Sequence, residues 1–165
     1  MQDIRITIDM KACTPDELPE QDRRLVEMAR EATRNSLATY SGFHVGAAIL
    51  MDNGKIVTGA NQENAAYPSG LCAERTACFY AGARYPGVPM KKIAIAARNV
   101  GSTPEGTPWE ESFQFEPISP CGACRQALLE YENLYGPIEV ILYGRRHVLV
   151  LPSVSSLLPL SFTEF

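Results

Sequence analysis

The hydrophobic positions of the chain switch between the spacing of strands and the spacing of helices. Isoleucine recurs at every second residue over 4–8, which indicates a short strand or an extended arm. Residues 14–37 open with the helix-capping pattern Thr-Pro-Asp-Glu and then place apolar residues at intervals of three and four, so we expect a first helix there. Two strand-like runs at about 43–51 and 55–61 flank Asp-Asn-Gly. Because Asn-Gly is the strongest short-range hairpin signal, these runs predict antiparallel strands.

The rest of the chain places a helix before a strand twice. Residues 72–83 form a helical run that Tyr-Pro-Gly-Val-Pro ends, and the continuous apolar run at 91–97 indicates a buried strand. Residues 120–136 predict a second such helix, 138–144 the strand that follows it, and 147–151 a candidate fifth strand. Helices that alternate with mostly buried strands after a hairpin indicate an α/β layered domain with a mixed sheet.

Two segments of this single domain (1–165) fall outside the alternation. Residues 1–14 form an amino-terminal extension. The segment at about 98–117 is rich in proline, glycine and glutamate and is longer than most connections in compact domains, so we interpret it as an inserted loop. Its Trp109 and Phe113 either cover an apolar patch of this chain or contact another subunit.

Charge and hydropathy exclude several classes of partner. The formal net charge is -4 and the only basic clusters lie at 91–92 and 145–147, whereas nucleic-acid binding needs many lysines and arginines against phosphates. No apolar segment approaches the roughly 20 residues that cross a bilayer, and the amino terminus lacks the basic start and apolar block of a secretory signal. We therefore expect a cytoplasmic protein with reduced thiols, a small-molecule substrate, and no nucleic-acid or membrane partner.

Three of the five cysteines lie at predicted helix starts. Cys72 begins one helix, and Cys121 and Cys124 begin another, where unpaired backbone N–H groups and the helix dipole favour thiolates. A lone Cys-x-x-Cys also suits a redox pair or half of a structural zinc site. A third cysteine makes a set that leaves one zinc coordination position open, as catalytic zinc sites do. The remaining cysteines and histidines lack a partner at metal-ligand spacing and are interpreted as structural: Cys13, Cys78, His44 and His147.

Glu74 and Arg75 follow the first of these cysteines. A carboxylate two residues from a zinc ligand can reach a metal-bound water and pass its proton to a leaving group, but an acid at a helix start is also favoured by the dipole alone. Arg75 either donates to thiolate sulfur, offsetting the excess negative charge of three thiolates around Zn²⁺, or is a solvated helix residue. The spacing favours neither interpretation of the arginine.

Four stretches of the chain carry a family resemblance: YSGFHVGAAIL, GANQENAAYPSGLCAERTA, SPCGACRQALLEY and SLLPLSF. Together, and in this order, they resemble the cytidine deaminases of pyrimidine salvage in the three-cysteine zinc class, and they cover most of the chain from about residue 37 onward. The resemblance implies a homotetramer of three-layer α/β/α subunits, each with a mixed five-stranded sheet and one Zn²⁺. It also implies hydrolytic deamination of cytidine and 2'-deoxycytidine to uridine and 2'-deoxyuridine, with attack at C4 of the ring and release of ammonia.

The resemblance also assigns roles to individual residues. Cys72, Cys121 and Cys124 match the zinc ligands. Glu74 matches the proton shuttle and Arg75 the arginine that hydrogen-bonds the thiolates. The substrate-binding positions that match are Phe43 against the base, Asn61 and Glu63 at the ribose 3'-hydroxyl, the backbone amide of Ala73 on the base, and Phe162 in the pocket of a neighbouring subunit.

Other functions fit part of this pattern. A deaminase of a cytosine nucleoside antibiotic such as blasticidin S shares the CAE and PCGxCRQ motifs, although Asn61 and Glu63 favour an ordinary nucleoside. Cytidylate deaminases and polynucleotide editors usually have histidine where Cys72 stands, which places both behind a nucleoside enzyme. From a different class, a structural-zinc or thiol redox domain would use the cysteines and have no need of Glu74.

Overall fold

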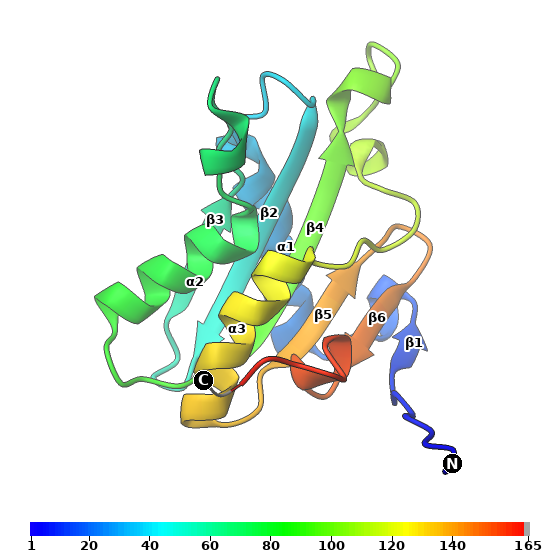
Figure 1. Ribbon diagram of the computed structural model, residues 1–165. Helices are drawn as coiled ribbons and strands as arrows, with labels where there is room; N and C mark the ends of the chain where they lie inside the picture. The colour runs from blue at the N-terminus through cyan, green and yellow to red at the C-terminus, as the bar shows by residue number, and fades with distance from the viewer. Residues whose placement is uncertain (164–165) are drawn as a thin grey trace.

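The computed structural model describes residues 1–163 as a six-stranded mixed sheet between helices (Figure 1). The strand order across the sheet is β1-β6-β5-β4-β2-β3. β4 and β5 run parallel, and every other neighbouring pair is antiparallel. The strands are β1 (Lys11–Cys13), β2 (Phe43–Met51), β3 (Ile56–Ala60), β4 (Met90–Asn99), β5 (Glu139–Tyr143) and β6 (Val148–Leu151).

The five strands predicted from residue 43 onward are all present, and the expected count of five is one too low. The additional strand, β1, pairs its three residues antiparallel with Val148–Val150 of β6. It follows the isoleucine-rich run at 4–8, which itself joins no strand. Lys-Ala-Cys has no apolar alternation, so a strand held only by backbone pairing leaves no periodic signal in the sequence.

The helices complete three layers. α1 (Glu20–Ala32) covers one face of the sheet, and α2 (Ala73–Arg84) and α3 (Gly122–Tyr135) cover the other, as Figure 1 shows. Because β4 and β5 are parallel, the chain must return from the end of β4 to the opposite edge of the sheet, where β5 begins. The crossover connection that does this contains α3. None of the helices described within residues 1–163 is both long enough and apolar enough to cross a membrane.

The first helix begins later than its sequence pattern predicts. Thr14 and Glu17 do form the expected capping box, in which the Thr14 N–H donates to the Glu17 carboxylate at 2.7 Å, but it caps only a single 3₁₀ turn. Pro19 then holds Leu18 in an extended conformation with ψ 142°, because the ring of proline clashes with a helical residue before it. The α-helix therefore starts at Glu20.

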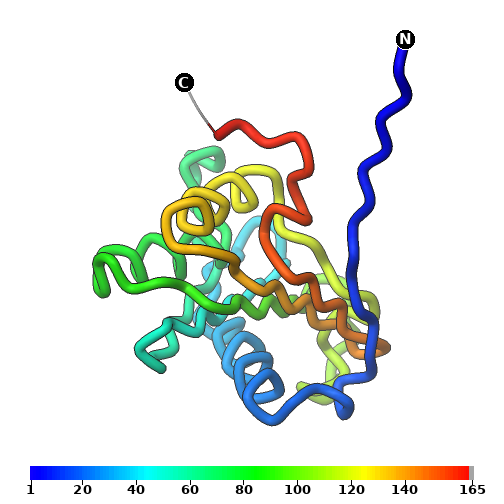
Figure 2. Tube along the Cα trace, turned by 90° about the horizontal axis from the view of Figure 1, so that it is seen from below, coloured from blue at the N-terminus to red at the C-terminus, as the bar shows by residue number. Residues whose placement is uncertain are grey.

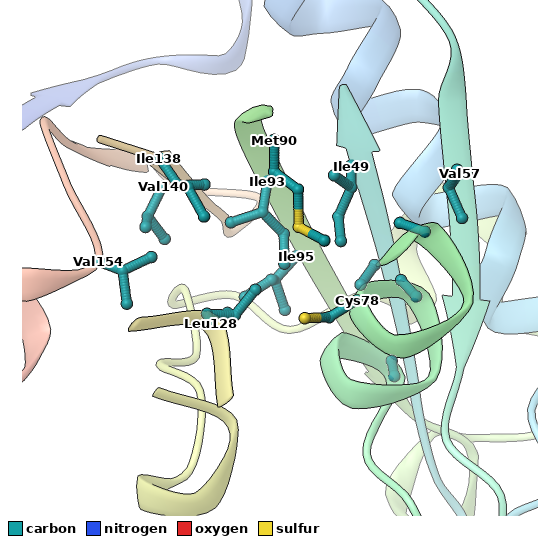
Figure 3. Close-up of a cluster of buried hydrophobic side chains, with 14 of the residues drawn as sticks. Ile49, Val57, Cys78, Met90, Ile93, Ile95, Leu128, Ile138, Val140 and Val154 are labelled. Carbon is teal, nitrogen blue, oxygen red and sulfur yellow. The ribbon is translucent and has the colours of Figure 1, made fainter. Parts of the chain in front are cut away.

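Alternate residues of the central strands build two cores. In β2, Val45, Ala47 and Ile49 face α2 and α3, whereas Ala48 and Leu50 face α1. Figure 3 shows the first of these clusters. It includes the fully buried side chains Ile93, Ile95, Cys78 and Leu128, so the prediction of a buried Cys78 thiol is confirmed.

Two glycines let the helices approach the hairpin closely. A Cβ at Gly46 would lie 2.0 Å from the backbone oxygen of Ala29 in α1, and a Cβ at Gly59 would lie 2.5 Å from the backbone nitrogen of Ala77 in α2. Any side chain at either position would push a helix off the sheet. The second contact fixes α2 over β3, and with it the place where α2 begins.

The inserted segment at about 98–117 packs on its own chain. It contains two short 3₁₀ turns, and Phe113 forms a bridge back to Arg98. The Trp109 ring lies 4.9 Å from the Phe113 ring and 3.5 Å from the Arg34 guanidinium, and Phe113 is 2% exposed in the α1 core. Of the two interpretations of these aromatic residues, the structure therefore favours cover for an apolar patch of this chain.

Candidate active site

The amino-terminal ends of α2 and α3 meet on one face of the sheet. Cys72 is the residue immediately before α2 and Cys121 the residue immediately before α3, while Cys124 lies in the first turn of α3. The chain before Cys72 is held by reciprocal backbone hydrogen bonds between Gln62 and Leu71, at 2.8 and 3.0 Å. Two helix dipoles thus direct their positive ends at the same three thiols, which favours negative charge on sulfur.

Arg125 holds the segment that precedes α3 in place. Its Nε donates to the backbone oxygen of Pro120 at 2.8 Å, and its Nη1 donates to the backbone oxygen of Leu157 at 2.7 Å. A third bond joins Nη2 to the Ser119 hydroxyl at 2.9 Å. The residue directly before Cys121 is therefore tied to the carboxy-terminal segment, a link that sequence reasoning did not assign although Arg125 lies in the quoted PCGACRQ motif.

The three thiols have the spacing of a zinc site. The Sγ atoms of Cys72 and Cys121 are 3.8 Å apart, those of Cys121 and Cys124 are 3.5 Å apart, and all three lie within 4.8 Å of one another. Tetrahedral zinc with Zn–S bonds of about 2.3 Å sets its sulfur ligands about 3.8 Å apart. Among residues 1–163 no other group of three or more metal-ligating side chains gathers in this way. The cluster fits one zinc ion per subunit.

The surroundings of the cluster shift the pKa values of two of its thiols in opposite directions. Hydrogen bonding from Cys124, helped by the Arg75 guanidinium, lowers the pKa of Cys72 to about 5 in spite of burial. Hydrogen bonding to Cys72 and burial raise the pKa of Cys124. Arg75 lies with Nη2 4.0 Å from the Cys72 sulfur, so the structure favours the thiolate-facing interpretation over a solvated helix arginine.

Glu74 is a buried acid at this centre. It lies in the first turn of α2, is 3% exposed and borders the same cavity as Cys72 and Cys121. Burial raises the pKa of Glu74 to about 7. An acid that served only the helix dipole would be expected at the surface, where its charge is solvated, and Glu74 is inside.

A cavity of about 490 Å³ opens in front of the thiol cluster. Its volume falls in the range that holds small organic ligands in proteins. Phe43 and Ile118 contribute apolar side chains to its lining, and Ser41 and Tyr67 contribute hydroxyl groups. The residues predicted for the site that line it are Phe43, Asn61, Glu63, Cys72, Glu74, Arg75 and Cys121.

Three of the residues predicted for the site do not line this cavity: Cys124, which is fully buried, Ala73 and Phe162. Ala73 is fully buried as the first residue of α2, between Cys72 and Glu74. Phe162 is 65% exposed, and its backbone oxygen accepts a hydrogen bond from the Gln126 side chain at 2.8 Å. Within its own chain, Phe162 is therefore not part of the pocket.

Asn61 and Glu63 also hold the chain around the pocket. The Asn61 side chain accepts from the Val45 N–H at 2.8 Å and donates to the Phe43 oxygen at 2.9 Å, which ties the end of β3 to the start of β2. The Glu63 carboxylate accepts from the Ser41 hydroxyl and from backbone N–H groups of the same loop. Ser41 carries no periodic or spacing signal in the sequence, so its contact with Glu63 becomes visible only in the fold.

Comparisons with known proteins agree with this geometry. Residues 19–135 match the family model for the cytidine and deoxycytidylate deaminase zinc-binding region. A cytidine deaminase of Sporosarcina psychrophila is 35% identical over 144 residues, which cover 86% of this chain and 90% of that protein. The crystal structure of cytidine deaminase from Burkholderia pseudomallei superposes with a TM-score of 0.68 at 37% identity, covering 88% of this chain and all of that one.

A more distant relative has a different name. A blasticidin-S deaminase of Bacillus cereus is 29% identical over 147 residues, covering 89% of this chain and 96% of that protein. The family model spans both helix starts that carry the thiols, together with strands β2, β3 and β4. The matched region, the relatives and the thiol cluster with the spacing of a zinc site together show that the chain belongs to the cytidine and deoxycytidylate deaminase family.

Proposed function

We propose that the protein catalyses the hydrolytic deamination of cytidine and 2'-deoxycytidine to uridine and 2'-deoxyuridine, with release of ammonia. The observation that carries this proposal is the buried carboxyl of Glu74, which lines the same cavity as two thiols of the cluster; the three thiols have the spacing of a zinc site, and the cavity is large enough for a nucleoside. The names of the similar proteins from Sporosarcina and Burkholderia support the same reaction.

Cys72, Cys121 and Cys124 would hold the zinc ion. When bound, zinc supplies Lewis acidity and makes a water molecule acidic enough to react at neutral pH. Three thiolates exceed the charge of Zn²⁺ by one, and Arg75, 4.0 Å from the Cys72 sulfur, offsets that excess. Cys124 is fully buried, so one side of the cluster is closed to solvent, whereas Cys121 is exposed toward the cavity.

Glu74 would move the protons of the reaction. A hydrolytic deamination must take a proton from the attacking water and give one to the departing amino group, so one carboxyl can serve both steps. Burial holds the pKa of Glu74 near 7, where a carboxyl both accepts and releases a proton readily. Its place in the first turn of α2 keeps this carboxyl fixed relative to Cys72.

The remaining pocket residues would hold the nucleoside. Phe43 packs against the base, and Asn61 and Glu63 bind the ribose 3'-hydroxyl through an amide and a carboxylate. The backbone amide of Ala73, at the first position of α2, binds the base. Phe162 would complete the pocket of a neighbouring subunit in a homotetramer, which its 65% exposure and its absence from the pocket of its own chain support.

The cellular setting follows from the same chemistry. All five cysteines are unpaired in the structure, as expected for a reducing compartment, so we assign the enzyme to the cytoplasm. Recovery of cytosine nucleosides as uracil nucleosides places it in pyrimidine salvage. The whole chain, 1–165, would act as one catalytic domain, with residues 1–14 and about 98–117 as additions to it; residues 164–165 lie outside the described part.

One assay tests the substrate. Purified protein is mixed separately with cytidine, 2'-deoxycytidine and blasticidin S, and the loss of the cytosine-type ultraviolet absorbance is followed together with ammonia release. We expect turnover of both nucleosides and at most slow turnover of the antibiotic. Rapid loss of absorbance with blasticidin S alone would assign the chain to the antibiotic-inactivating branch instead.

Glu74→Gln tests the mechanism. The amide keeps the size of the side chain and cannot take up the water proton, so we expect kcat to fall by about 10²- to 10⁴-fold with one zinc retained per chain. Zinc content is measured by atomic absorption and turnover by ammonia release. Glu130→Gln, on the exposed side of α3, is the matched control and should behave as the wild type. Unimpaired turnover in Glu74→Gln would favour a structural-zinc or thiol redox role.

A further inference from the structure

Residues 1–10 extend away from the body of the protein. Figure 2 shows this segment running outward from β1 as an extended chain. Every residue from 1 to 10 is exposed. Within the described residues 1–163, none of these ten takes part in a strand pairing, a hydrogen bond or an ion pair.

The segment has the side-chain alternation of a strand that lacks its neighbours. Its apolar residues fall on one face of an extended chain and its polar residues on the other. The apolar side chains are 41 to 85% exposed. Such a row of exposed side chains and unpaired backbone groups at a sheet edge is a template for pairing with another strand. The apolar set is Ile4, Ile6, Ile8 and Met10, and the polar set is Asp3, Arg5, Thr7, Asp9 and Lys11.

The pattern is complementary to itself about Thr7. If two copies pair antiparallel with Thr7 opposite Thr7, Arg5 of each chain faces Asp9 of the other, and Asp3 faces Lys11. The apolar residues then face one another on the opposite side, at positions 4 with 10 and 6 with 8. Directly opposite residues of an antiparallel pair share a face, so all charged pairs and all apolar pairs form together.

Neighbouring registers lose this match. A shift by two in one direction sets Asp3 opposite Asp9, and a shift by two in the other sets Arg5 opposite Lys11, so each places like charges together. A shift by one sets polar residues opposite apolar ones. Parallel pairing in register sets every charge opposite its own copy. Among these arrangements, only the register centred on Thr7 satisfies both faces.

We propose that residues 3–11 of two chains pair as antiparallel strands across a two-fold axis at Thr7, joining two protomers through their amino-terminal arms. The place in the fold permits this, because β1 is the edge strand of the sheet and has β6 on one side only. An interface of this kind is isologous, with the same segment contributed by both partners. It lies at the β1 edge, separate from the thiol cluster at the helix starts, and it does not depend on the proposed reaction.

Disulfide trapping in the full-length protein tests the register. In Thr7→Cys the two new thiols would face each other with Cβ atoms about 5 Å apart, close enough for a disulfide after a small adjustment. In the matched control Asp3→Cys they would be eight residues apart along the pair, about 26 Å. Under mild oxidation we expect at least about tenfold more covalent dimer from Thr7→Cys than from Asp3→Cys. Equal yields from the two variants would overturn the proposal.

Charge exchange tests the pairing in solution. Arg5→Asp sets two acidic residues opposite each other twice per dimer, Asp9→Arg does the same with two basic residues, and the double variant restores opposite charges with the original net charge. By sedimentation velocity at low salt, we expect each single variant to weaken the arm-dependent association at least about fivefold and the double variant to recover it. Arm-dependent association means the self-association step that is lost when residues 2–10 are removed. If removal changes nothing, or if the double variant is no better than the singles, the proposal is wrong.

Discussion

The two ends of helix α3 bury polar groups in opposite ways. At the amino-terminal end Cys124 and the nearby Glu74 are almost fully buried, and burial raises the pKa of Glu74 to about 7. At the carboxy-terminal end Glu132 is 9% exposed, and its carboxylate accepts backbone N–H bonds from Ile138, Val154 and Ser155 at 2.7 to 2.9 Å. Burial alone therefore does not identify a reactive carboxyl: Glu132 is held by three backbone donors, whereas Glu74 borders the thiol cluster and the cavity.

The cysteines repeat this contrast. Cys78 and Cys124 are both fully buried. Cys78 is the sixth residue of α2, and Cys124 lies in the first turn of α3. Cys78 lies among apolar side chains, and burial raises its pKa to about 12, so it remains a neutral thiol. Cys124 instead has the Cys121 sulfur 3.5 Å away. Cysteine therefore packs in the hydrophobic core at position 78 and belongs to a cluster with the spacing of a metal site at position 124.

Replacing each buried cysteine with alanine should give the largest difference in zinc content and turnover between the thiol cluster and the apolar core. Cys124→Ala removes a proposed zinc ligand, so we expect zinc content to fall below about a tenth of an ion per chain and turnover to fall at least about 100-fold. Cys78→Ala should keep both and lose about 1–2 kcal/mol of unfolding free energy through the cavity it leaves. Atomic absorption, cytidine turnover and urea unfolding measure the three quantities. Full zinc retention in Cys124→Ala would remove the basis of the contrast.

Glu132→Gln should have the opposite profile to Glu74→Gln. One carboxylate oxygen becomes an amide N–H₂ that faces a backbone donor, so we expect the free energy of unfolding to fall by about 2–3 kcal/mol. The pocket is at the other end of α3, so kcat/KM per folded molecule should stay within about twofold. Urea unfolding at 25 °C and cytidine turnover check the two halves. A loss of turnover without a loss of stability would contradict the structural role.

The part of the fold that could be predicted from the sequence is the part encoded locally. The hairpin follows from Asn53 and Gly54, where Gly54 takes a positive φ of 77° that a turn of this kind requires. The start of α1 was predicted wrongly because the real capping box at Thr14 masked the stronger constraint of Pro19. β1 was missed because it depends on pairing with a strand more than 130 residues away.

The candidate site shows the same limit. The thiols at the two helix starts were predictable because residue type and spacing alone restrict their use, and the structure brings them together. The bonds of Arg125 and the contact between Ser41 and Glu63 were not, because they join segments that only the fold makes adjacent. Roles for Phe43, Asn61 and Phe162 came from family resemblance and remain proposals.

Lys92 extends the comparison of buried charges to the α1 face. Its Nζ lies 2.6 Å from Asp22, which is 5% exposed, and 2.9 Å from Glu139. Lys92→Met keeps the apolar stem and leaves Asp22 without its cation. We expect a loss of about 1–2 kcal/mol near neutral pH, reduced from the cost of breaking a fully buried pair because Lys92 is partly exposed. Lys91→Met, at an exposed pair with Asp52, is the control and should cost less than about 0.5 kcal/mol.

The difference between wild type and Lys92→Met should depend on pH at the alkaline end. Burial opposes the charge of Lys92, but its hydrogen bonds to Asp22 and Glu139 raise its pKa above the ordinary value. A raised pKa means stabilisation that is complete below the unfolded-state value of about 10.4 and is lost as pH rises through the folded-state value. Urea unfolding should therefore give a constant difference from pH 7 to about 10 and a smaller one above. A difference that grows toward pH 11 would contradict this account.

Trp109→Leu should have the smallest effect and decides what the inserted segment does. The ring contacts Phe113 at 4.9 Å and the Arg34 guanidinium at 3.5 Å, all within one chain. Losing an edge-to-face contact and a partly solvated cation–π contact should cost about 1 kcal/mol of unfolding free energy. Because the ring packs on its own protomer, molar mass by light scattering and kcat/KM should not change. Phe115→Leu, at an exposed ring of the same segment, is the control. A change in molar mass confined to Trp109→Leu would show that this face contacts a second subunit, and the segment would then belong with assembly rather than with the α1 core.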